Sequence, residues 1–304
     1  MPSKTEKKKC PQCGQRSEIR TDRTYCSLDC FHAARSKKAK HEKRDTTQRV
    51  VFSTDHHIPH LDPKFWSILM QVVQDVKPTW KVLGGDFLDE YNLSLKFAQP
   101  GSPGPGFPFE VDEGERRLRQ LRRELPASAR LTWIEGNHDY RLKSLLNMSP
   151  HAAKLKNVTK RGVKVLSIPY LLDLKKNGCE YVECPNEKWT TTKIDIGQGF
   201  YLGHFDKCNK WAGYAAKNIQ DILAASFITG HNHSGGVIHR TTASGAVWGF
   251  EGGCGCYLNP PYMEPTNWAQ MIHVIHIEKG VPPEVERIHI QDGRARYGGR
   301  LYRA

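Results

Sequence analysis

The sequence lacks any apolar run long enough to cross a bilayer, which takes roughly 18 to 20 residues. Its N-terminus, MPSKTEKKK, is charged but is not followed by the apolar segment of a secretory signal, so we expect a soluble, cytoplasmic protein. An extracellular disulfide framework is also disfavoured. The nine cysteines are an odd number and four of them lie within the first 30 residues, which indicates reduced thiols with a metal among them.

Acidic residues are scarce near the N-terminus. Residues 1–49 contain 14 Lys and Arg but only 6 Asp and Glu, so +8 of the total formal charge of +13 lies in this segment. Such a basic arm suits a polyanionic partner, most simply nucleic acid, although a solvated tail is the ordinary alternative. The overall composition, with 38% hydrophobic and 25% charged residues, is that of a globular protein with a sizeable core.

Three segments follow one another along the 304 residues, without an internal repeat. We expect a zinc-binding module at 1–34, a basic linker at 35–48, and a catalytic α/β domain at 49–304 with an Arg-rich C-terminal tail. In the domain, helical spacing is predicted over 63–76 and 111–125, a Pro- and Gly-rich surface loop over 99–108, and a hairpin from 271–277 and 285–290.

Five short apolar runs in this domain have the pattern of buried strands, at 49–54, 80–84, 130–135, 199–203 and 225–229. Each is followed at once by possible metal ligands, in the motifs DHH, GDFLD, GNHD, GH and GHNH. The carboxyl ends of strands in an α/β sheet converge on one crevice. A single motif of this kind is commonly a turn or a structural histidine, but five in succession at five strand ends indicate one metal centre.

The order of these motifs, DxH, GDxxD, GNHD, GH and GHxH, resembles that of the calcineurin-like metallophosphoesterase superfamily over residues 50–240. The resemblance implies a four-layer α/β/β/α sandwich and a hydrolase that cleaves phosphate esters with two divalent ions, Mn²⁺ first and Fe or Zn²⁺ as alternatives. The wider layout, with GNHDYR, WGFEGGCGCY and Asn267-Trp268, is most similar to members encoded by bacteriophages, which implies the host cytoplasm.

The resemblance also implies which residues bind the two ions. Asp86 would bridge both ions through its carboxylate oxygens. The other ligands would be Asp55, His57 and His233 on one ion, and Asn137, His204 and His231 on the other.

His138 would lie beside the ions without binding them, and would protonate the leaving oxygen or stabilise the transition state. Asp139, the next residue, would orient or charge the His138 imidazole. Both catalytic roles are implied by the resemblance.

Four further residues near the motifs have expected roles. Asp89 would hold a ligand histidine in its tautomer. Arg141 is a candidate phosphate contact in substrate binding, with a structural ion pair as the alternative. His56 and His60 flank the first motif and either could face substrate, although an extended chain points His56 away from its neighbours and favours a structural role for it.

The zinc-binding module is defined by Cys10, Cys13, Cys26 and Cys30, with the spacing C-x2-C-x12-C-x3-C. Four thiolates at this spacing fit one structural Zn²⁺, and a module this small could not fold on its core alone. It resembles treble-clef and ribbon-type zinc fingers, some of which accompany nucleases. A Zn²⁺ ion with four thiolates has a net charge of about −2, so the segment stays basic.

These features favour a nuclease or end-processing enzyme that hydrolyses phosphodiester bonds in DNA or RNA. The Arg- and Tyr-bearing tail, GRARYGGRLYRA, would add phosphate contacts and stacking. The alternative is a phosphatase or phosphodiesterase for small nucleotides or phosphoproteins, with the finger used for protein contact. A non-catalytic nucleic-acid-binding protein is disfavoured because every ligand position and His138 are present.

Overall fold

The computed structural model describes residues 5–21, 24–31, 47–97, 105–243, 245–259 and 267–304. The chain divides into two compact units, residues 1–46 and residues 47–304, called here the N-terminal unit and the catalytic unit. Residues 35–46 of the predicted basic linker, 35–48, lie outside the described residues. The last residue of the predicted linker, Gln48, is the first residue of a strand.

The N-terminal unit is a small hairpin with almost no apolar core. Strands β1 (Thr5–Lys9) and β2 (Arg16–Arg20) pair antiparallel, and a helical turn follows at 28–31. Between the strands, the backbone N–H of Gly14 donates to Cys10 O at 2.9 Å. Among the described residues of this unit, the buried hydrophobic side chains are Cys10 and Ile19, so apolar burial contributes little to its fold.

The first sheet of the catalytic unit has six strands in the order β15-β14-β3-β4-β5-β8. Its four strands from β3 to β8 are parallel, and β14 and β15 are antiparallel to their neighbours. The strands are β3 (Gln48–Ser53), β4 (Trp80–Leu83), β5 (Arg130–Ile134), β8 (Cys179–Val182), β14 (Gln270–Glu278) and β15 (Val281–Ile290).

The second sheet has five strands in the order β12-β13-β11-β10-β9, and β10, β11 and β13 are parallel to one another. The strands are β9 (Lys193–Asp195), β10 (Phe200–Gly203), β11 (Ser226–Thr229), β12 (Val237–Thr242) and β13 (Gly245–Glu251). The five strands predicted from the sequence are therefore confirmed: three lie in the first sheet and two in the second.

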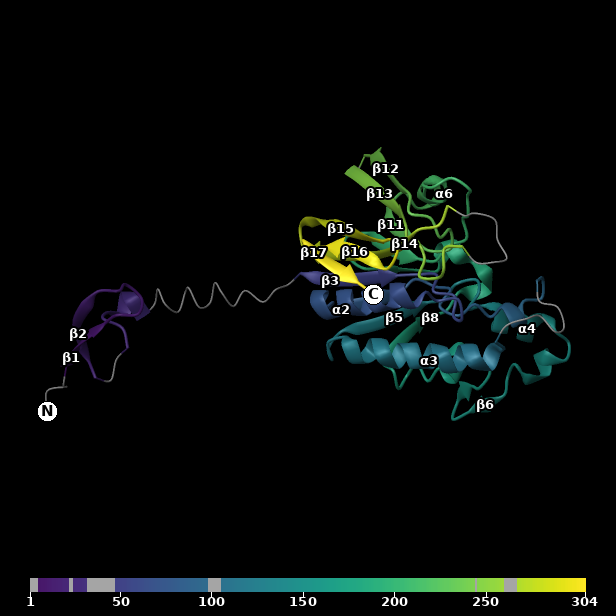
Figure 1. The fold of residues 1–304 in the computed structure, drawn as a ribbon, viewed down its shortest axis with the longest axis horizontal. Helices are drawn as coiled ribbons and strands as arrows, with labels where there is room; N and C mark the ends of the chain where they lie inside the picture. Colours follow the sequence, from purple (N-terminus) through teal and green to yellow (C-terminus); the bar gives the residue numbers. More distant parts are fainter. Residues whose placement is uncertain (1–4, 22–23, 32–46, 98–104, 244, 260–266) are drawn as a thin grey trace. The chain divides into compact units, whose positions relative to one another are not determined.

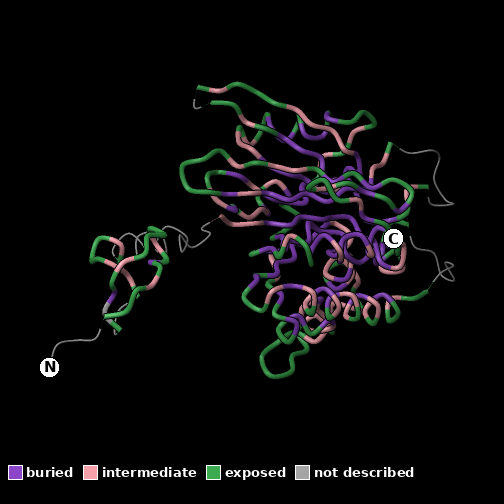
Figure 2. The backbone as a smooth tube through the Cα atoms, turned by 60° about the vertical axis from the view of Figure 1, so that its left-hand side comes forward, coloured by how far each residue is buried: buried purple, intermediate pink, exposed green. Residues whose placement is uncertain are grey.

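Alternate side chains of β3 enter two different cores. Val51 faces α2 (Pro63–Val76) and α3 (Phe107–Glu124), which cover the outer face of the first sheet. Val50 and Phe52 instead join residues of both sheets in a second core between them. A third core lies between the second sheet and α6 (Tyr214–Leu223). Figures 1 and 2 show the resulting four-layer α/β/β/α sandwich, with the buried chain concentrated in its strands, as predicted.

The helix predicted at 63–76 is confirmed at those bounds. Asp62 caps it by accepting from the backbone N–H of Lys64, and Pro63 suits the first helical position. The second predicted helix begins earlier than expected, at Phe107, because Pro108 also fits a first turn. The predicted loop at 99–108 is therefore too long at its end, and its residues 99–104 lie outside the described ones. None of the helices in the described ranges is long and apolar enough to span a membrane.

The C-terminal region forms two successive hairpins. The first, β14–β15, confirms the prediction, although its turn is shorter than expected because Val281 already belongs to β15. The second, β16 (Arg294–Tyr297) and β17 (Arg300–Arg303), was not predicted. It packs against α2, where Arg300 and Tyr302 bind the Asp75 carboxylate at 2.5 and 2.8 Å.

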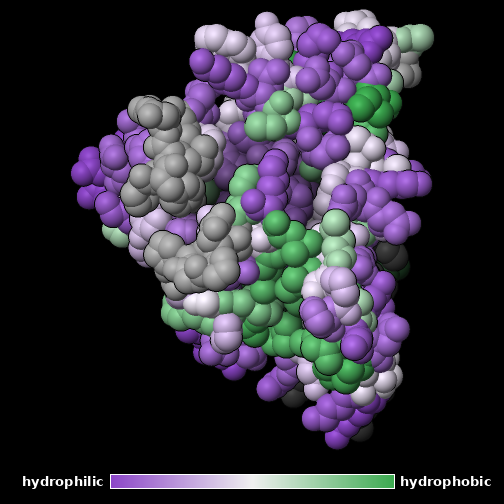
Figure 3. All heavy atoms as spheres, turned by 90° about the vertical axis from the view of Figure 1, so that its right-hand side faces the viewer, coloured by the Kyte–Doolittle hydropathy of each residue, from purple (hydrophilic) through white to green (hydrophobic). Residues whose placement is uncertain are grey.

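The remaining short elements connect the layers. They are η1 (Tyr91–Leu93), α4 (Arg141–Met148), η2 (Ala152–Leu155), β6 (Thr159–Lys160), β7 (Val163–Lys164), α5 (Ile168–Leu171), η3 (Pro185–Glu187) and η4 (Trp189–Thr191). Figure 3 looks onto the right-hand end of Figure 1. This face is largely hydrophilic, with a hydrophobic area near the residues drawn in grey.

Candidate metal centre

The structure brings all seven predicted ligands together at the ends of five strands. Asp55, Asp86 and their neighbours follow strands β3, β4 and β5 of the first sheet. The remaining ligands follow β10 and β11 of the second sheet. The ligand atoms form groups in which all atoms lie within 4.8 Å of one another: Asp55, His57 and His233; and Asp86, His204 and His231. A third such group, His57, Asp86 and His138, shares a residue with each of them.

The first group has two imidazoles directed at one carboxylate. His233 Nε2 is 3.1 Å from Asp55 Oδ1 and 3.1 Å from His57 Nε2. Two ring nitrogens and a carboxylate oxygen that face one another are a donor set for a cation such as Mn²⁺, Fe or Zn²⁺. The residues therefore fit a divalent ion.

The second group is linked to the first through Asp86. Its Oδ2 lies 3.2 Å from His204 Nε2 and 3.8 Å from His57 Nε2, so one carboxylate faces both groups. Asn137 Oδ1 lies 2.9 Å from the same His204 nitrogen. This is the position that a bridging ligand must take, although metal binding by the seven residues stays a prediction.

The backbone at this centre is unusual. Five of the predicted ligands have positive φ although they are not glycine: Asp55, His57, Asp86, His231 and His233. Each such residue costs roughly 1–3 kcal/mol and clusters of them are typical of functional sites. A side chain at Gly136 would collide with Asp86, and one at Gly230 with Thr54 and Asp55. The glycines of the GNHD and GHNH motifs are therefore required by the close approach of the ligand loops.

Charge at the centre is balanced between buried acids and imidazoles. Burial alone would raise the pKa of Asp55 and Asp86, but His233 beside one and His204 beside the other lower both pKa values. Burial lowers the pKa of His204 and of His233, yet the neighbouring carboxylates outweigh it and raise each pKa to about 9. Both imidazoles would hold a proton at neutral pH, which a bound ion must displace, so metal affinity is expected to increase with pH.

Two ligand histidines are oriented through their second ring nitrogen. His57 Nδ1 lies 2.8 Å from Asp89 Oδ1, and His204 Nδ1 lies 3.0 Å from Gly84 O. A carboxylate or carbonyl at this nitrogen fixes the tautomer of a metal-binding imidazole. Asp89 therefore lies where the expected tautomer-holding role requires.

His138 lies beside the same carboxylate. Its Nδ1 is 2.9 Å from Asp89 Oδ1, and Arg141 Nη2 is 3.1 Å from its Nε2. Arg141 also donates to Asp89 O at 2.8 Å, so its contacts are with the site and not those of the alternative ion pair. Asp89 thus contacts both His57 and His138.

The role expected of Asp139 is wrong in one respect, because its carboxylate does not orient the His138 imidazole. It is buried and accepts four hydrogen bonds of 2.9–3.1 Å, from the backbone N–H groups of Phe87, Leu88 and Gly136 and from the indole of Trp133. Burial, with Asp86 nearby, raises the pKa of Asp139 to about 7. Asp139 therefore holds the GDFLD and GNHD loops together, while Asp89 contacts the imidazole.

Aromatic side chains complete the wall of the centre. A cavity of about 220 Å³ opens over the ligands and is also lined by His60, Tyr257 and Trp268. Trp268 packs on the ligand His233 with 4.3 Å between ring centroids. Tyr257, the last residue of WGFEGGCGCY, and Asn267-Trp268 were noted only as part of the wider layout. His56 is fully buried, with Nε2 3.0 Å from Ser53 Oγ, which agrees with a structural role.

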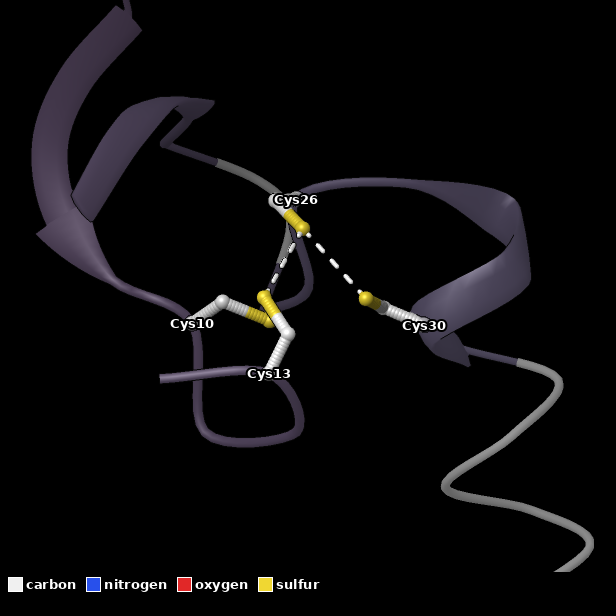
Figure 4. A group of neighbouring side chains, drawn as sticks. All are labelled: Cys10, Cys13, Cys26 and Cys30. Atoms are coloured by element: carbon white, nitrogen blue, oxygen red, sulfur yellow. Dashed lines mark hydrogen bonds between the residues drawn. The ribbon is translucent and has the colours of Figure 1, made fainter. Parts of the chain in front are cut away.

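In the N-terminal unit, the four predicted cysteines form a separate cluster (Figure 4). Cys26 Sγ lies 3.7 Å from Cys13 Sγ and 3.4 Å from Cys30 Sγ. All four sulfur atoms lie within 4.8 Å of one another, which suits a tetrahedral Zn²⁺ site.

A model of the calcineurin-like phosphoesterase family matches residues 48–265, which is more than half of the chain. The chain belongs to this family, whose members hydrolyse phosphoesters at a dinuclear metal site. No curated protein matches the chain.

Several solved structures resemble it at low identity. Vacuolar protein sorting 29 from Cryptosporidium parvum is 11% identical, with a TM-score of 0.42 over 86% of this chain and 100% of that one. A predicted phosphoesterase from Streptococcus pneumoniae is 11% identical, with a TM-score of 0.32 over 85% and 99%. The phosphoesterase Yfce from E. coli is 12% identical, with a TM-score of 0.33 over 76% and 89%.

Proposed function

We propose that this protein is a two-metal phosphodiesterase that acts on nucleic acid, with Mn²⁺ in the catalytic unit and a structural Zn²⁺ in the N-terminal unit. The observation that carries the proposal is that a full set of candidate metal ligands and a basic four-cysteine unit belong to one chain. The first supplies phosphoester hydrolysis, and the second supplies positive charge for a polyanion.

We expect the ligand residues to be divided between the two ions according to the groups that they form. Asp55, His57 and His233 would hold one ion, Asn137, His204 and His231 the other, and Asp86 both. When bound, two divalent ions polarise the phosphate and activate water for in-line attack. The buried carboxylates and the close loops fix this arrangement before substrate arrives, which is the condition for electrostatic stabilisation of a transition state.

His138 would act on the leaving group. Its imidazole lines the cavity over the ligands, with Nε2 4.0 Å from Asp86 Oδ2. Asp89 contacts Nδ1 and so leaves Nε2 as the nitrogen that faces the phosphate. Because Arg141 can only donate, Nε2 accepts from it here, and the imidazole would donate a proton to the leaving oxygen once Arg141 has turned to the phosphate and Nε2 has taken up a proton. Arg141, beside that nitrogen, is placed to contact a phosphate oxygen.

A panel of substrates tests the proposal. The full chain with Mn²⁺ is assayed on bis-p-nitrophenyl phosphate, p-nitrophenyl phosphate, and single- and double-stranded DNA and RNA. We expect diester to be cleaved in preference to monoester, and at least one nucleic acid to be cleaved.

The catalytic unit alone, residues 47–304, is the matched control, since it is a compact unit by itself. It should cleave the chromogenic diester as the full chain does, with a higher KM on nucleic acid and a salt dependence shallower by roughly 0.7–0.9 per lost phosphate contact. Cleavage of monoesters or small nucleotides alone would contradict the nucleic-acid proposal.

A further inference from the structure

The cavity over the metal ligands has neighbours on two sides. We name it the metal cavity. Tyr257 and His60 also line a second cavity of about 370 Å³, the Lys64 cavity. On the other side, Trp268 also lines a third cavity of about 500 Å³, the Arg287 cavity. Each neighbour thus shares a wall with the metal cavity, and each shared wall contains an aromatic ring. A row of hollows suits a substrate that continues beyond the reacting phosphate.

Trp268 is held firmly in its wall. The backbone N–H of the next residue, Ala269, donates to the carbonyl of the ligand His233 at 2.9 Å. The indole also packs on the His233 ring. Its position relative to the predicted ions is therefore fixed by the ligand itself, and the residue also lines the Arg287 cavity.

The Arg287 cavity is positively charged. Two exposed residues of β15, Arg287 and His289, line it, and no acidic side chain does so among the described lining residues. The Arg287 guanidinium is held in place, because its Nη2 donates to Gly235 O and lies 3.5 Å from Met271 Sδ. A cation that is fixed but exposed is suited to bind a phosphate oxygen through its remaining N–H groups.

The Lys64 cavity is different. Asp62 and Asp292 line it together with Lys64. Asp62 already accepts from the backbone N–H of Lys64 and from Gln270. This mixture of charges disfavours a phosphate there.

We propose that the Arg287 cavity binds the nucleotide next to the scissile phosphate of a single-stranded nucleic acid, with its base stacked on Trp268 and its phosphate on Arg287. The inference rests on the proposed function and specifies its substrate. An indole face can stack only on a base that is free of its own neighbours, so a single strand fits and a paired duplex does not. Ala212 lines this cavity and follows Trp211 in the chain, a residue that is 64% exposed.

The test compares Arg287→Ala with Arg123→Ala. Arg123 is exposed on α3 and lines none of the three cavities, so its loss removes the same charge elsewhere. The full chain with Mn²⁺ is assayed on a single-stranded oligonucleotide, on its duplex and on bis-p-nitrophenyl phosphate. For Arg287→Ala, we expect the ratio of kcat/KM on the single strand to that on the chromogenic diester to fall by roughly 10- to 100-fold, the effect of one lost charge-assisted hydrogen bond. Arg123→Ala should keep this ratio.

A second variant, Trp268→Leu, should raise KM for the single strand by roughly 5- to 100-fold, the range for one lost stacking contact. Metal content is measured in parallel, because Trp268 contacts a ligand. Equal ratios for the two arginine variants, or a single strand bound more weakly than its duplex, would overturn the inference while leaving nucleic-acid hydrolysis intact. If the wild-type chain cleaves no nucleic acid but does cleave the chromogenic diester, the proposed function fails and the inference fails with it. If Arg287→Ala is unfolded, Arg287→Gln replaces it, and a retained ratio in that variant counts against the inference.

Discussion

The two units of this chain depend on metal in opposite ways. In the N-terminal unit the described buried hydrophobic side chains are Cys10 and Ile19, and its four sulfur ligands converge on one point. The described part of the catalytic unit has four apolar clusters, two of them large, with the predicted ligands at the rim of one end. We expect the first unit to need an ion in order to fold, and the second to be folded by its cores and to need ions for chemistry. The comparison shows why one chain can use cysteines for one task and histidines with carboxylates for the other.

The largest expected effect is on catalysis. Chelation with EDTA should abolish hydrolysis of bis-p-nitrophenyl phosphate while the catalytic unit stays folded by circular dichroism, and Mn²⁺ should restore activity better than Ca²⁺. Asp86→Ala should reduce kcat/KM on the order of 10⁴-fold, because Asp86 faces both ligand groups. Asp112→Ala, at an exposed position of α3, is the control. Activity that survives exhaustive chelation would disprove the two-metal centre.

A smaller loss is expected at His138, which lines the cavity without being a predicted ligand. His138→Gln should leave about two ions per catalytic unit, measured by mass spectrometry of the metals, and lower turnover by ~10²–10⁴-fold, the range for a lost general acid. If the variant retains only one ion, His138 is a ligand and the proposed proton transfer is wrong.

Cys26→Ser tests whether the two units differ in their dependence on metal for folding. This change should remove the single Zn²⁺ and unfold the N-terminal unit, since zinc binding supplies roughly 10–16 kcal/mol to modules of this size. The catalytic unit should keep its melting temperature and its hydrolysis of the chromogenic diester. Cys208→Ser, at an exposed thiol of the catalytic unit, should keep the Zn²⁺. A shared loss of stability would show that the two units fold as one.

The smallest expected effect is on the stability of the catalytic unit, whose large cores bury carboxyl groups. Burial raises the pKa of Glu110 from 4.5 to about 7. The pKa of Glu110 is higher in the folded state, so ionisation of its carboxyl group destabilises the fold. This destabilisation is absent below pH 4.5 and grows as the pH rises to 7. Glu110→Gln resembles the neutral acid, so it should stabilise the catalytic unit by about 1–3 kcal/mol at pH 8 and by little at pH 4.5. Urea unfolding at both pH values measures this. An equal effect at both values would exclude titration as the cause.

Much of the fold and most of the candidate site could be predicted because both depend on local patterns. Buried strands such as β3 are short apolar runs, and a motif that begins where a strand ends lies at the edge of the sheet. The DHH motif was therefore expected at the centre from its place in the chain, and the family resemblance implied Asp55 and His57 as its ligands.

What was missed depends on contacts between distant segments. Asp139 adjoins His138 in sequence, but the turn directs its carboxylate to N–H groups some fifty residues away, on the loop after β4. Asp89 contacts His138 instead, across 49 residues. The hairpin β16–β17 is rich in Arg and suggested a phosphate-binding tail, yet Arg300 is paired with Asp75 of α2. Trp268 reaches the centre only through the packing of β14 beside β3, which no local pattern encodes.

The origin of the ligands in two sheets has a mechanical consequence. His57 follows β3 of the first sheet and His233 follows β11 of the second, and the two are 176 residues apart in the chain. An ion held by both would cross-link the two sheets of the sandwich, much as a disulfide joins distant segments. The sheets could then separate only after the ion is lost, so the loaded protein should unfold slowly even where its equilibrium stability is modest.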